Sequence, residues 1–331
     1  MQASDHQEVL SKVKQLQKDL EICTHPGLVQ CGKVPTMLGY GMLDDLPFLV
    51  MEMADSGTLL HMLSADHEWS VRLNVLQQVA LAVKVLHQNG MTHGDIKLEN
   101  VLIFSRADNG FDARLSDFSH STYDLDSSEP SGVYRYFGSW PITPPEVWTG
   151  SGQEVFGETC DIWAYSIILW RVCQYRNDDA LKRLSFVPRH DDALGDTDMS
   201  SLLERLEAAE LDFSTLLKTS ESVDAEHRED IAAVFLRCFH LTTSKRCSAS
   251  DLYDTLMTIA GKQPSSELND AFSNLQLNTS EESAGLEVSR TDMSARLIDD
   301  GVETKEPQVP AWKAFVKDLP MTKVSLSPPL R

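Results

Sequence analysis

The sequence has no long hydrophobic run, no paired cysteine motif and few basic residues. No stretch approaches the ~18 consecutive apolar residues that a membrane helix needs, so we expect no membrane span. Residues 1–8 contain neither a basic segment nor an apolar one, which argues against a secretory signal. We therefore expect an intracellular protein, cytoplasmic or nuclear, with reduced and mostly buried thiols rather than disulfides or a zinc site. The six scattered cysteines are Cys23, Cys31, Cys160, Cys173, Cys238 and Cys247.

Basic residues are scarce: 29 Lys and Arg stand against 50 Asp and Glu, which gives a formal net charge of −21. Such a field repels a phosphate backbone and argues against non-specific nucleic-acid binding. Residues 177–230 alone hold fifteen acidic and six basic side chains. Two interpretations of this acidic insert stay open: a solvated, partly flexible surface, or a docking surface for a basic partner.

The 331 residues suffice for one large domain with additional segments. Hydrophobic periodicity predicts helices over residues 7–24, 69–89, 160–173, 200–210, 228–239 and 249–259. Strands are expected at 33–38 and 47–53, split by a turn-like 39–45, and at 101–104 and 113–115. The Asn109-Gly110 pair favours a two-residue hairpin turn between the last two strands. From residue 262 apolar periodicity fades, and we expect a mostly disordered tail.

The most informative stretch is residues 92–100, Thr-His-Gly-Asp-Ile-Lys-Leu-Glu-Asn, between a predicted helix and a predicted hairpin. A second polar group, Asp117-Phe118-Ser119, follows seventeen residues after Asn100. Phosphoryl transfer needs one carboxylate to accept the hydroxyl proton, one cation near the moving phosphate and oxygen ligands for magnesium. Asp95 fits the first role, Lys97 the second, and Asn100 with Asp117 the third.

On these residues the chain resembles the eukaryotic protein kinase superfamily, with its H-x-D-x-K-x-x-N catalytic loop and D-F-x turn. Lys97, two residues after the aspartate, resembles the serine/threonine group. Further motifs follow in order: residues 138–146 resemble G-T-x-x-x-x-A-P-E, residues 161–164 resemble D-x-W-S, and residues 245–248 resemble R-x-[ST]. The resemblance covers roughly residues 10–260.

This resemblance implies a bilobal α+β fold over residues 1–261, followed by the tail, 262–331. The partial N-lobe would be residues 1–54, and the mainly helical C-lobe would be residues 55–261 with the acidic insert. It also implies a serine/threonine kinase that uses ATP and Mg2+, with a protein substrate and no membrane or nucleic-acid partner. The oligomeric state is not specified, and a basic substrate would suit the acidic surface.

Residue roles are carried over by the same resemblance. Asp95 would be the base, Lys97 would contact the γ-phosphate, and Asn100 and Asp117 would hold the metal. Met51 would be the gatekeeper, and the cofactor-binding residues would be Glu52, Met53, Lys97, Asn100 and Asp117. The structural motif residues would be His93, Phe118, Ser139, Glu146, Asp161 and Arg246. Among these, Glu146 and Arg246 should form a buried ion pair, and His93 should tie the catalytic loop to the D-F-x turn.

The chain also departs from the family pattern. The helix at 7–24 resembles the one that carries the strand lysine's acidic partner, here Asp19 or Glu21, but no G-x-G or V-A-x-K precedes it. The first hairpin of the N-lobe is therefore expected to be missing, and Lys33 is a weaker candidate to reach a nucleotide. A pseudokinase scaffold and a chain whose missing hairpin lies upstream both stay open as alternatives.

Three substitutions inside the motifs carry separate expectations. Gly94 stands where the family has an arginine that anchors a phosphorylated loop. Ser119 replaces a glycine and should restrict positive φ at the turn. Glu99 is either a contact for a substrate arginine or a solvated surface residue.

Overall fold

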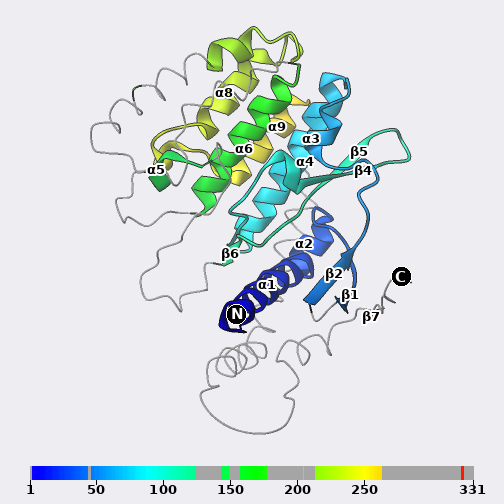
Figure 1. Ribbon diagram of the computed structural model, residues 1–331. Helices are drawn as coiled ribbons and strands as arrows, with labels where there is room; N and C mark the ends of the chain where they lie inside the picture. Colours follow the sequence, from blue (N-terminus) through cyan, green and yellow to red (C-terminus); the bar gives the residue numbers. More distant parts are fainter. Residues whose placement is uncertain are drawn as a thin grey trace, which may run out of the picture. The chain divides into compact units, whose positions relative to one another are not determined.

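The computed structural model describes residues 2–43, 46–123, 143–148, 157–176, 204, 213–262 and 322–323. Ser139, most of the predicted helix at 200–210 and nearly all of the expected tail lie outside the described residues. The chain divides into two compact units (Figure 1). The first includes Met1–Lys14 and Met37–Val50 together with the described tail residues, and the second includes Gln15–Thr36 and Met51–Pro264.

A small sheet in the first unit contains β1 (Met37–Leu43), β2 (Leu46–Met51) and β7 (Thr322–Lys323) in the order β2-β1-β7. The strand β7 runs parallel to β1, with Gly39 opposite Thr322. The strand predicted at 47–53 is confirmed as β2, whereas the one predicted at 33–38 begins only at Met37, and residues 39–43 of the predicted turn belong to β1. Residues 33–36 make their backbone hydrogen bonds outside this sheet. The backbone oxygen of Thr36 accepts from Glu52 N–H, and the backbone oxygen of Lys33 accepts from Leu115 N–H. The two glycines that suggested a turn lie within β1.

Two helices open the chain: α1 (Gln2–Cys23) and α2 (Pro26–Cys31). The predicted helix at 7–24 is confirmed, and it begins earlier than its periodicity indicated. Pro26 begins the second of these helices, where a proline in the first helical turn loses no intrahelical bond. Gly32 ends α2 with φ +66°, the left-handed conformation that glycine adopts readily.

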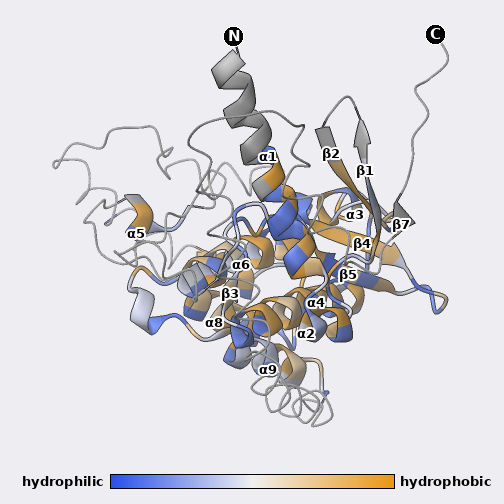
Figure 2. Ribbon diagram, turned by 90° about the horizontal axis from the view of Figure 1, so that it is seen from below, coloured by the Kyte–Doolittle hydropathy of each residue, from blue (hydrophilic) through white to orange (hydrophobic). Residues whose placement is uncertain are grey.

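The second unit is mainly helical, with its core around α4 (Trp69–Gln88) and α6 (Gly157–Cys173). Figure 2 shows both helices coloured largely as hydrophobic, and nearly every residue of α6 is buried, as expected of a helix surrounded by others. Other helices in the described part of the unit are α3 (Leu59–Met62), α5 (Pro145–Trp148), α8 (Arg228–Cys238) and α9 (Ala249–Ile259), and residues 213–218 are also helical. Five of the six predicted helices are thus confirmed, namely α1, α4, α6, α8 and α9, and α6 begins three residues before its predicted start.

In residues 213–230, the end of the predicted acidic insert, apolar side chains pack into this core, whereas the acidic side chains of the segment are exposed. The side chains of Phe213, Leu217 and Val223 are at most 1% exposed. The Phe213 ring lies 4.6 Å from that of Trp170, centroid to centroid. The burial of its apolar side chains therefore determines where this segment lies. Residues 177–203 and 205–212 of the insert lie outside the described part of the chain.

A hairpin of β4 (Val101–Ser105) and β5 (Phe111–Leu115) confirms the two strands predicted there, with Val101 opposite Leu115. The two-residue turn was wrong, because residues 106–110 all lie in the connection. Asn109 alone takes positive φ, +60°, in a turn closed by Arg106 N–H donating to Gly110 O. A second small ladder pairs β3 (Met91–Thr92) with β6 (Thr122–Tyr123).

The elements together make an α+β fold, as the sequence predicts. The described residues also contain two 3-10 helices, η1 (Leu98–Asn100) and η3 (Thr243–Lys245). Among these residues no helix is both long and apolar enough to cross a membrane.

Candidate active site

The segment 93–100 runs from β3 to β4, and a buried aspartate of α6 fixes its start. Asp161 is fully buried, and its carboxylate accepts hydrogen bonds from His93 N at 2.8 Å and Gly94 N at 2.9 Å. His87 Nε2 lies 3.0 Å from the same carboxylate. Buried backbone N–H groups need acceptors, so Asp161 determines the conformation of the loop that follows. This places Asp161 in the structural role that the resemblance implied.

Gly94 has a conformational reason to be glycine. Its φ is +79°, and a Cβ atom at this position would lie 2.5 Å from the backbone oxygen of His120. A side chain would require the backbone itself to move, because the obstructing atom is a carbonyl oxygen. The local backbone therefore explains why the family's arginine is absent here.

Asp95 is the centre of the polar contacts in this loop. Its side chain is 4% exposed, and Lys97 Nζ lies 2.5 Å from Asp95 Oδ2. Asn100 Nδ2 donates to Asp95 O at 2.9 Å and to Asp95 Oδ2 at 3.2 Å. The three residues that the sequence spacing singled out are thus in direct contact, and two donors orient one carboxylate.

Asp117 lies at the same end of the β4–β5 hairpin as Asn100. The register pairs Val101 with Leu115, and Ser116 N donates to Asn100 O at 2.9 Å. Asp117 is exposed and has φ +63°, a conformation that aspartate tolerates better than most residues. The positive φ of the turn therefore falls on Asp117 and not on Ser119, whose hydroxyl donates to Asp117 Oδ1 at 2.7 Å.

Asn100 and Asp117 offer the kind of donors that magnesium prefers. The Asn100 amide directs its nitrogen to Asp95, which turns its oxygen to the other side. Asp117 contributes an exposed carboxylate. Oxygen ligands of this type suit a small hard cation, so the residues present fit Mg2+.

His93 joins the loop to the turn, as the resemblance implied. Its Nε2 lies 3.1 Å from Ser116 O, and its ring centroid lies 5.0 Å from that of Phe118. Burial lowers the pKa of His93 below its usual 6.5, against the opposing effect of Asp161 and other neighbouring acids. A neutral imidazole packed on a buried phenyl ring has a structural role rather than a catalytic one.

The end of α1 contacts the turn directly. Of the two acids that the sequence left open, Asp19 reaches it: Asp19 Oδ1 accepts from Phe118 N at 2.7 Å. Glu21 instead accepts from Gln17 Nε2 at 2.9 Å within the helix. Lys18 Nζ donates to Ser121 O at 2.8 Å. Two consecutive residues of α1 therefore hold both sides of the Asp-Phe-Ser turn, and the sequence analysis had missed the lysine.

Asp19 is an unusual carboxyl group. Burial raises its pKa from 3.8 to about 6, the Phe118 N–H lowers it, and the negative charge of Asp117 raises it further. Because the carboxyl groups of Asp19 and Asp117 lie near the same turn, ionising the buried Asp19 carboxyl costs free energy. The protonation of Asp19 is thereby coupled to the charge around Asp117.

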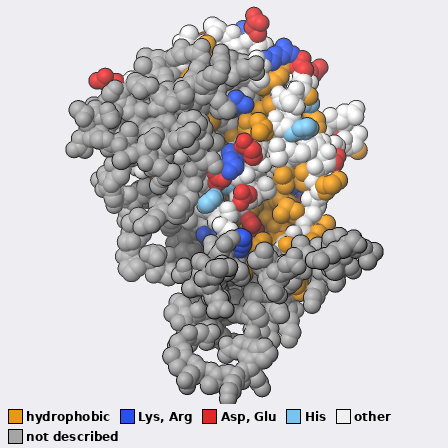
Figure 3. Space-filling view, viewed as in Figure 1, with side chains coloured by type: hydrophobic (Ala, Val, Ile, Leu, Met, Phe, Trp, Pro, Cys, Tyr) orange, Lys and Arg blue, Asp and Glu red, His pale blue; other side chains and the backbone are white. Residues whose placement is uncertain are grey.

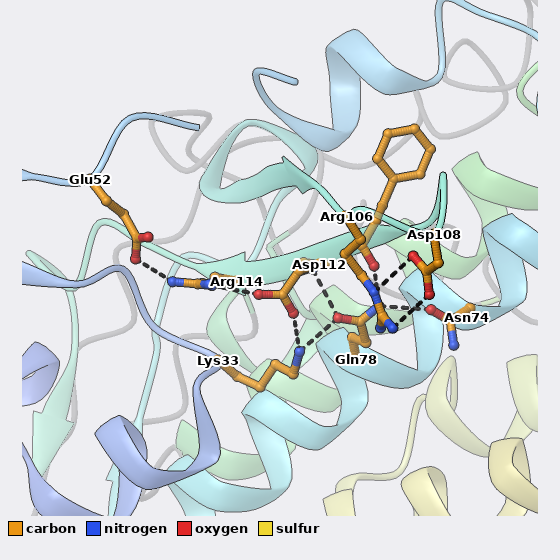
Figure 4. Close-up of polar contacts among 10 residues, drawn as sticks. Lys33, Glu52, Asn74, Gln78, Arg106, Asp108, Asp112 and Arg114 are labelled. Carbon is orange, nitrogen blue, oxygen red and sulfur yellow. Dashed lines mark hydrogen bonds and ion pairs between the residues drawn. The ribbon is translucent and has the colours of Figure 1, made fainter. Parts of the chain in front are cut away.

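A chain of ion pairs connects residue 52 with the outer side of the hairpin (Figure 4). Arg114 contacts Glu52 and donates through Nε to Asp112 Oδ2 at 2.7 Å. Asp112 in turn pairs with Lys33, whose Nζ also lies 2.7 Å from Gln78 Oε1. Lys33 is therefore held by Asp112 and Gln78, which argues against its reaching a nucleotide. Sequence reasoning missed Asp112 and Arg114, although their spacing of two puts them on one face of β5.

The proposed nucleotide-binding residues 52 and 53 differ in their surroundings. Glu52 N–H donates to Thr36 O at 3.0 Å, and the Glu52 carboxylate accepts from Thr36 N. Met53 is 82% exposed, and Met51, at the expected gatekeeper position, is 39% exposed. Large exposed apolar side chains gathered at one strand end are typical of a ligand-contacting surface.

The predicted ion pair between Glu146 and Arg246 is confirmed. Arg246 Nη1 lies 2.6 Å from Glu146 Oε1 and Nη2 lies 2.8 Å from Oε2, with the arginine side chain fully buried. Arg246 also donates to Thr159 O at 2.9 Å, and its guanidinium lies 5.0 Å from the centre of the Trp163 ring. This bidentate ion pair, together with the hydrogen bond from Arg246 to Thr159, holds α5 against the start of α6.

One further group of potential ligands does not suit a metal ion. The side chains of Asp224, Glu226 and His227 have ligand atoms within 4.8 Å of one another. His227 Nδ1, however, accepts a hydrogen bond from the indole N–H of Trp69 at 2.9 Å. That bond occupies one ring nitrogen and leaves the proton of a neutral imidazole on the other.

On the face shown in Figure 3, acidic and basic side chains lie next to one another, with hydrophobic side chains beside them. Arg171, on α6, is near Glu99, which opposes the lowering of the Arg171 pKa by burial. Glu99 is thus already close to one cation of this chain.

Comparison with known proteins identifies the family. The family model described as "Protein kinase domain" matches residues 3–256. The chain belongs to the protein kinase family. Residues 93–100, the Asp-Phe-Ser turn and the Glu146–Arg246 pair all lie within the matched residues of this kinase domain.

Curated relatives resemble parts of the chain. Calcium/calmodulin-dependent protein kinase type 1 of Caenorhabditis briggsae is 31% identical over 39% of this chain and 35% of its own length. Ovarian-specific serine/threonine-protein kinase Lok of Drosophila melanogaster is 28% identical over 50% of this chain and 33% of its own length. Human mitogen-activated protein kinase kinase kinase 4 is 28% identical over 51% of this chain and 10% of its own length. The matched stretches thus span about a third or less of these relatives.

Proposed function

We propose that this chain is a serine/threonine protein kinase that transfers the γ-phosphate of ATP to a hydroxyl group of a protein. The observation that carries the proposal is the contact of Lys97 and Asn100 with the one buried carboxylate of Asp95. That cluster lies at the hairpin end that also bears Asp117. Serine and threonine as acceptors follow from Lys97 and from the printed names of the relatives.

Asp95 accepts the proton of the attacking hydroxyl in this proposal. Its carboxylate is held by Lys97 Nζ and Asn100 Nδ2, so its orientation is set before a substrate arrives. A preoriented base within reach of a hydroxyl typically contributes about 10²–10⁴ in rate. Lys97 presents its positive charge beside this base, where it would also contact the γ-phosphate as it moves.

Asn100 and Asp117 would hold Mg2+ in the same proposal. Bound magnesium neutralises the negative charge that develops on the phosphate oxygens. The chain's own contribution is positional: Asp161 fixes the loop that carries Asn100, and Asp19 fixes the turn that carries Asp117. Both anchors come from helices, which are firmer supports than loops.

The nucleotide base would lie against residues 52 and 53. Glu52 uses its N–H and its carboxylate in contacts with Thr36 and Arg114, which leaves its backbone carbonyl for a ligand. Met53 would contribute apolar surface. The ion-pair chain through Arg114 and Asp112 would keep this segment in place before the nucleotide binds.

Two measurements on this 331-residue chain test the proposal together: the shift in melting temperature on adding Mg2+ and ATP, and incorporation of labelled phosphate into a basic protein. The kinase proposal predicts both a magnesium-dependent shift and phosphate on serine or threonine. Asp117→Asn should abolish the magnesium dependence, whereas Asp230→Asn, an exposed aspartate on α8, should leave both readouts unchanged. A folded chain that shows no incorporation would contradict the proposal and favour a protein-interaction scaffold.

A further inference from the structure

Two buried cysteines lie in contact at the junction of α8 and the segment that precedes α9. Cys238 is the last residue of α8, and Cys247 follows Arg246 directly. Their Sγ atoms are 3.6 Å apart, and the residues are 0% and 8% exposed. Backbone contact supports the same juxtaposition, because Cys247 N donates to Arg237 O at 3.0 Å. Thiols already in contact need only side-chain rotation to approach the 2.05 Å of a disulfide.

The electrostatic surroundings make the two sulfur atoms unequal. The hydrogen bond from Cys238 lowers the pKa of Cys247, burial opposes this, and the positive charge of Arg237 supports it. The same hydrogen bond and burial raise the pKa of Cys238 well above its usual 9.0. Of the two, Cys247 is therefore the one whose thiolate form is favoured, which is the division that thiol oxidation needs.

The other four cysteines lack this arrangement. Burial raises the pKa of Cys31 to about 11 and that of Cys173 to about 12. Burial likewise raises the pKa of Cys23 and of Cys160. A buried thiol without a stabilised thiolate is unreactive, so the six cysteines divide into one reactive pair and four inert residues.

We propose that Cys238 and Cys247 are a modification site at which a peroxide forms a reversible disulfide. The Cys247 thiolate attacks one peroxide oxygen, the O–O bond breaks, and a sulfenic acid forms with release of water. The Cys238 thiol then attacks the Cys247 sulfur, the S–O bond breaks, the S–S bond forms and a second water leaves. Two electrons and two protons pass from the thiols to one hydrogen peroxide, and a dithiol reductant reverses the reaction.

The disulfide would link α8 to the segment that carries Arg246. Because Arg246 is the buried partner of Glu146, the closed loop of residues 238–247 restricts the part of the chain that anchors α5. A cross-link of this kind stabilises chiefly by limiting the unfolded chain. This inference rests on the described helical unit and not on the proposed phosphate transfer.

Mass spectrometry tests the proposal on the full chain. The native protein is treated with hydrogen peroxide, its remaining thiols are alkylated in denaturant, and it is digested with trypsin. Trypsin cleaves after Arg237, Lys245 and Arg246, so the two cysteines fall on separate peptides. We expect these peptides joined, with a mass two hydrogens below the sum of the free peptides, and separated again by dithiothreitol. Recovery of both peptides alkylated, or of Cys247 as a sulfinic acid, would overturn the proposal.

A thermal measurement gives an independent readout. Peroxide should raise the melting temperature of the wild-type chain by several degrees, and dithiothreitol should reverse the rise. Cys247→Ser should abolish the rise, whereas Cys31→Ser, at a half-buried thiol on α2, should retain it. An equal rise in the Cys247→Ser variant, or no rise in the wild type, would contradict the disulfide.

Discussion

Asp19 Oδ1 accepts a hydrogen bond from the backbone N–H of Phe118 at 2.7 Å, across 99 positions of the sequence. This contact ties α1 to the turn that presents Asp117. In the sequence, this helix resembles the one that carries the acidic partner of a strand lysine, with Asp19 or Glu21 as the acid, although no V-A-x-K precedes it. In the structure its partner is the turn itself, so α1 and the turn are held together without any lysine from a preceding strand.

The buried carboxyl of Asp19 should make stability depend on pH. Its pKa is raised from 3.8 to about 6, so the folded state holds this proton more tightly than the unfolded state. Stability from this group is therefore greatest below pH 3.8 and is lost as pH rises through 6, with a span of about 1–3 kcal/mol. Asp19→Asn keeps an acceptor for Phe118 N–H and removes the titration.

Urea unfolding at several pH values checks this expectation. The variant should unfold with about the wild-type free energy near pH 4 and with a larger one at pH 7.5. A difference between the two proteins that stays constant over this range would rule out titration of Asp19 as its source.

Gly94 should tolerate no side chain. Gly94→Ala places a Cβ atom 2.5 Å from His120 O at φ +79°, and we expect a loss of about 2–4 kcal/mol in the free energy of unfolding. Gly32→Ala is the matched control: its φ is +66°, but no atom lies within 4 Å of the added Cβ. It should cost only the conformational penalty of about 1–2 kcal/mol. Equal losses in denaturant unfolding would show that the contact with His120 does not matter.

The ion-pair chain along β5 should contribute to stability. Lys33→Met leaves Asp112 without one partner, and we expect a loss of about 1–3 kcal/mol. Burial alone would raise the pKa of Asp112, but hydrogen bonds from Lys33 and Arg114 lower it below 3.8. The loss should therefore be full at pH 7 and should shrink as pH falls through the folded pKa of Asp112.

Arg106→Met provides the control on the same hairpin. Its pair with Asp108 is more than half exposed on both sides, so solvent screens it and its loss should change the free energy of unfolding little. Chemical unfolding of both variants at pH 7 and pH 3 distinguishes them. If Lys33→Met lowered the free energy of unfolding as little as Arg106→Met, the series of ion pairs and hydrogen bonds from Glu52 to Gln78 would contribute nothing to stability.

The Glu146–Arg246 pair should be among the costliest to break. Arg246→Met leaves the Glu146 carboxylate without its bidentate partner, and we expect a loss of about 3–5 kcal/mol. Arg176→Met removes an ion pair with Asp66 whose side chains are 63% and 67% exposed, so it should change the free energy of unfolding little. Differential scanning calorimetry should show a much larger fall in melting temperature for Arg246→Met, and similar falls would contradict the structural role of this pair.

Local motifs were the part of the site that sequence could predict. Asp95, Lys97 and Asn100 lie within six residues of one another, so their spacing alone indicated that they meet. The Glu146–Arg246 pair spans 100 positions, and only the resemblance to a family predicted it. For the contact between Asp19 and Phe118, the sequence predicted the helix. It did not predict which acid makes the contact or which group that acid binds, because both depend on packing.

The predictions that failed also concern features that depend on packing and pairing with distant parts of the sequence. Gly39 and Gly41 suggested a turn, yet neighbouring strands supply the hydrogen bonds that make residues 37–43 a strand. Acidic composition suggested a solvated segment up to residue 230; its described acidic side chains are exposed, but composition did not show that three apolar side chains of 213–223 are buried in the core. Arg114 and Asp112 carried no motif, and only the fold shows that they link residue 52 to Lys33.

The rate of phosphate transfer by the wild-type chain and by Asp95→Asn tests the central claim most directly. Both proteins are supplied with saturating magnesium ATP and a basic protein substrate, and labelled phosphate on serine and threonine is measured over time. The account predicts transfer by the wild type and a rate on the order of 10²–10⁴ lower for Asp95→Asn, with the melting temperature retained. Equal rates for the two proteins, or no transfer by a folded wild-type chain, would contradict it.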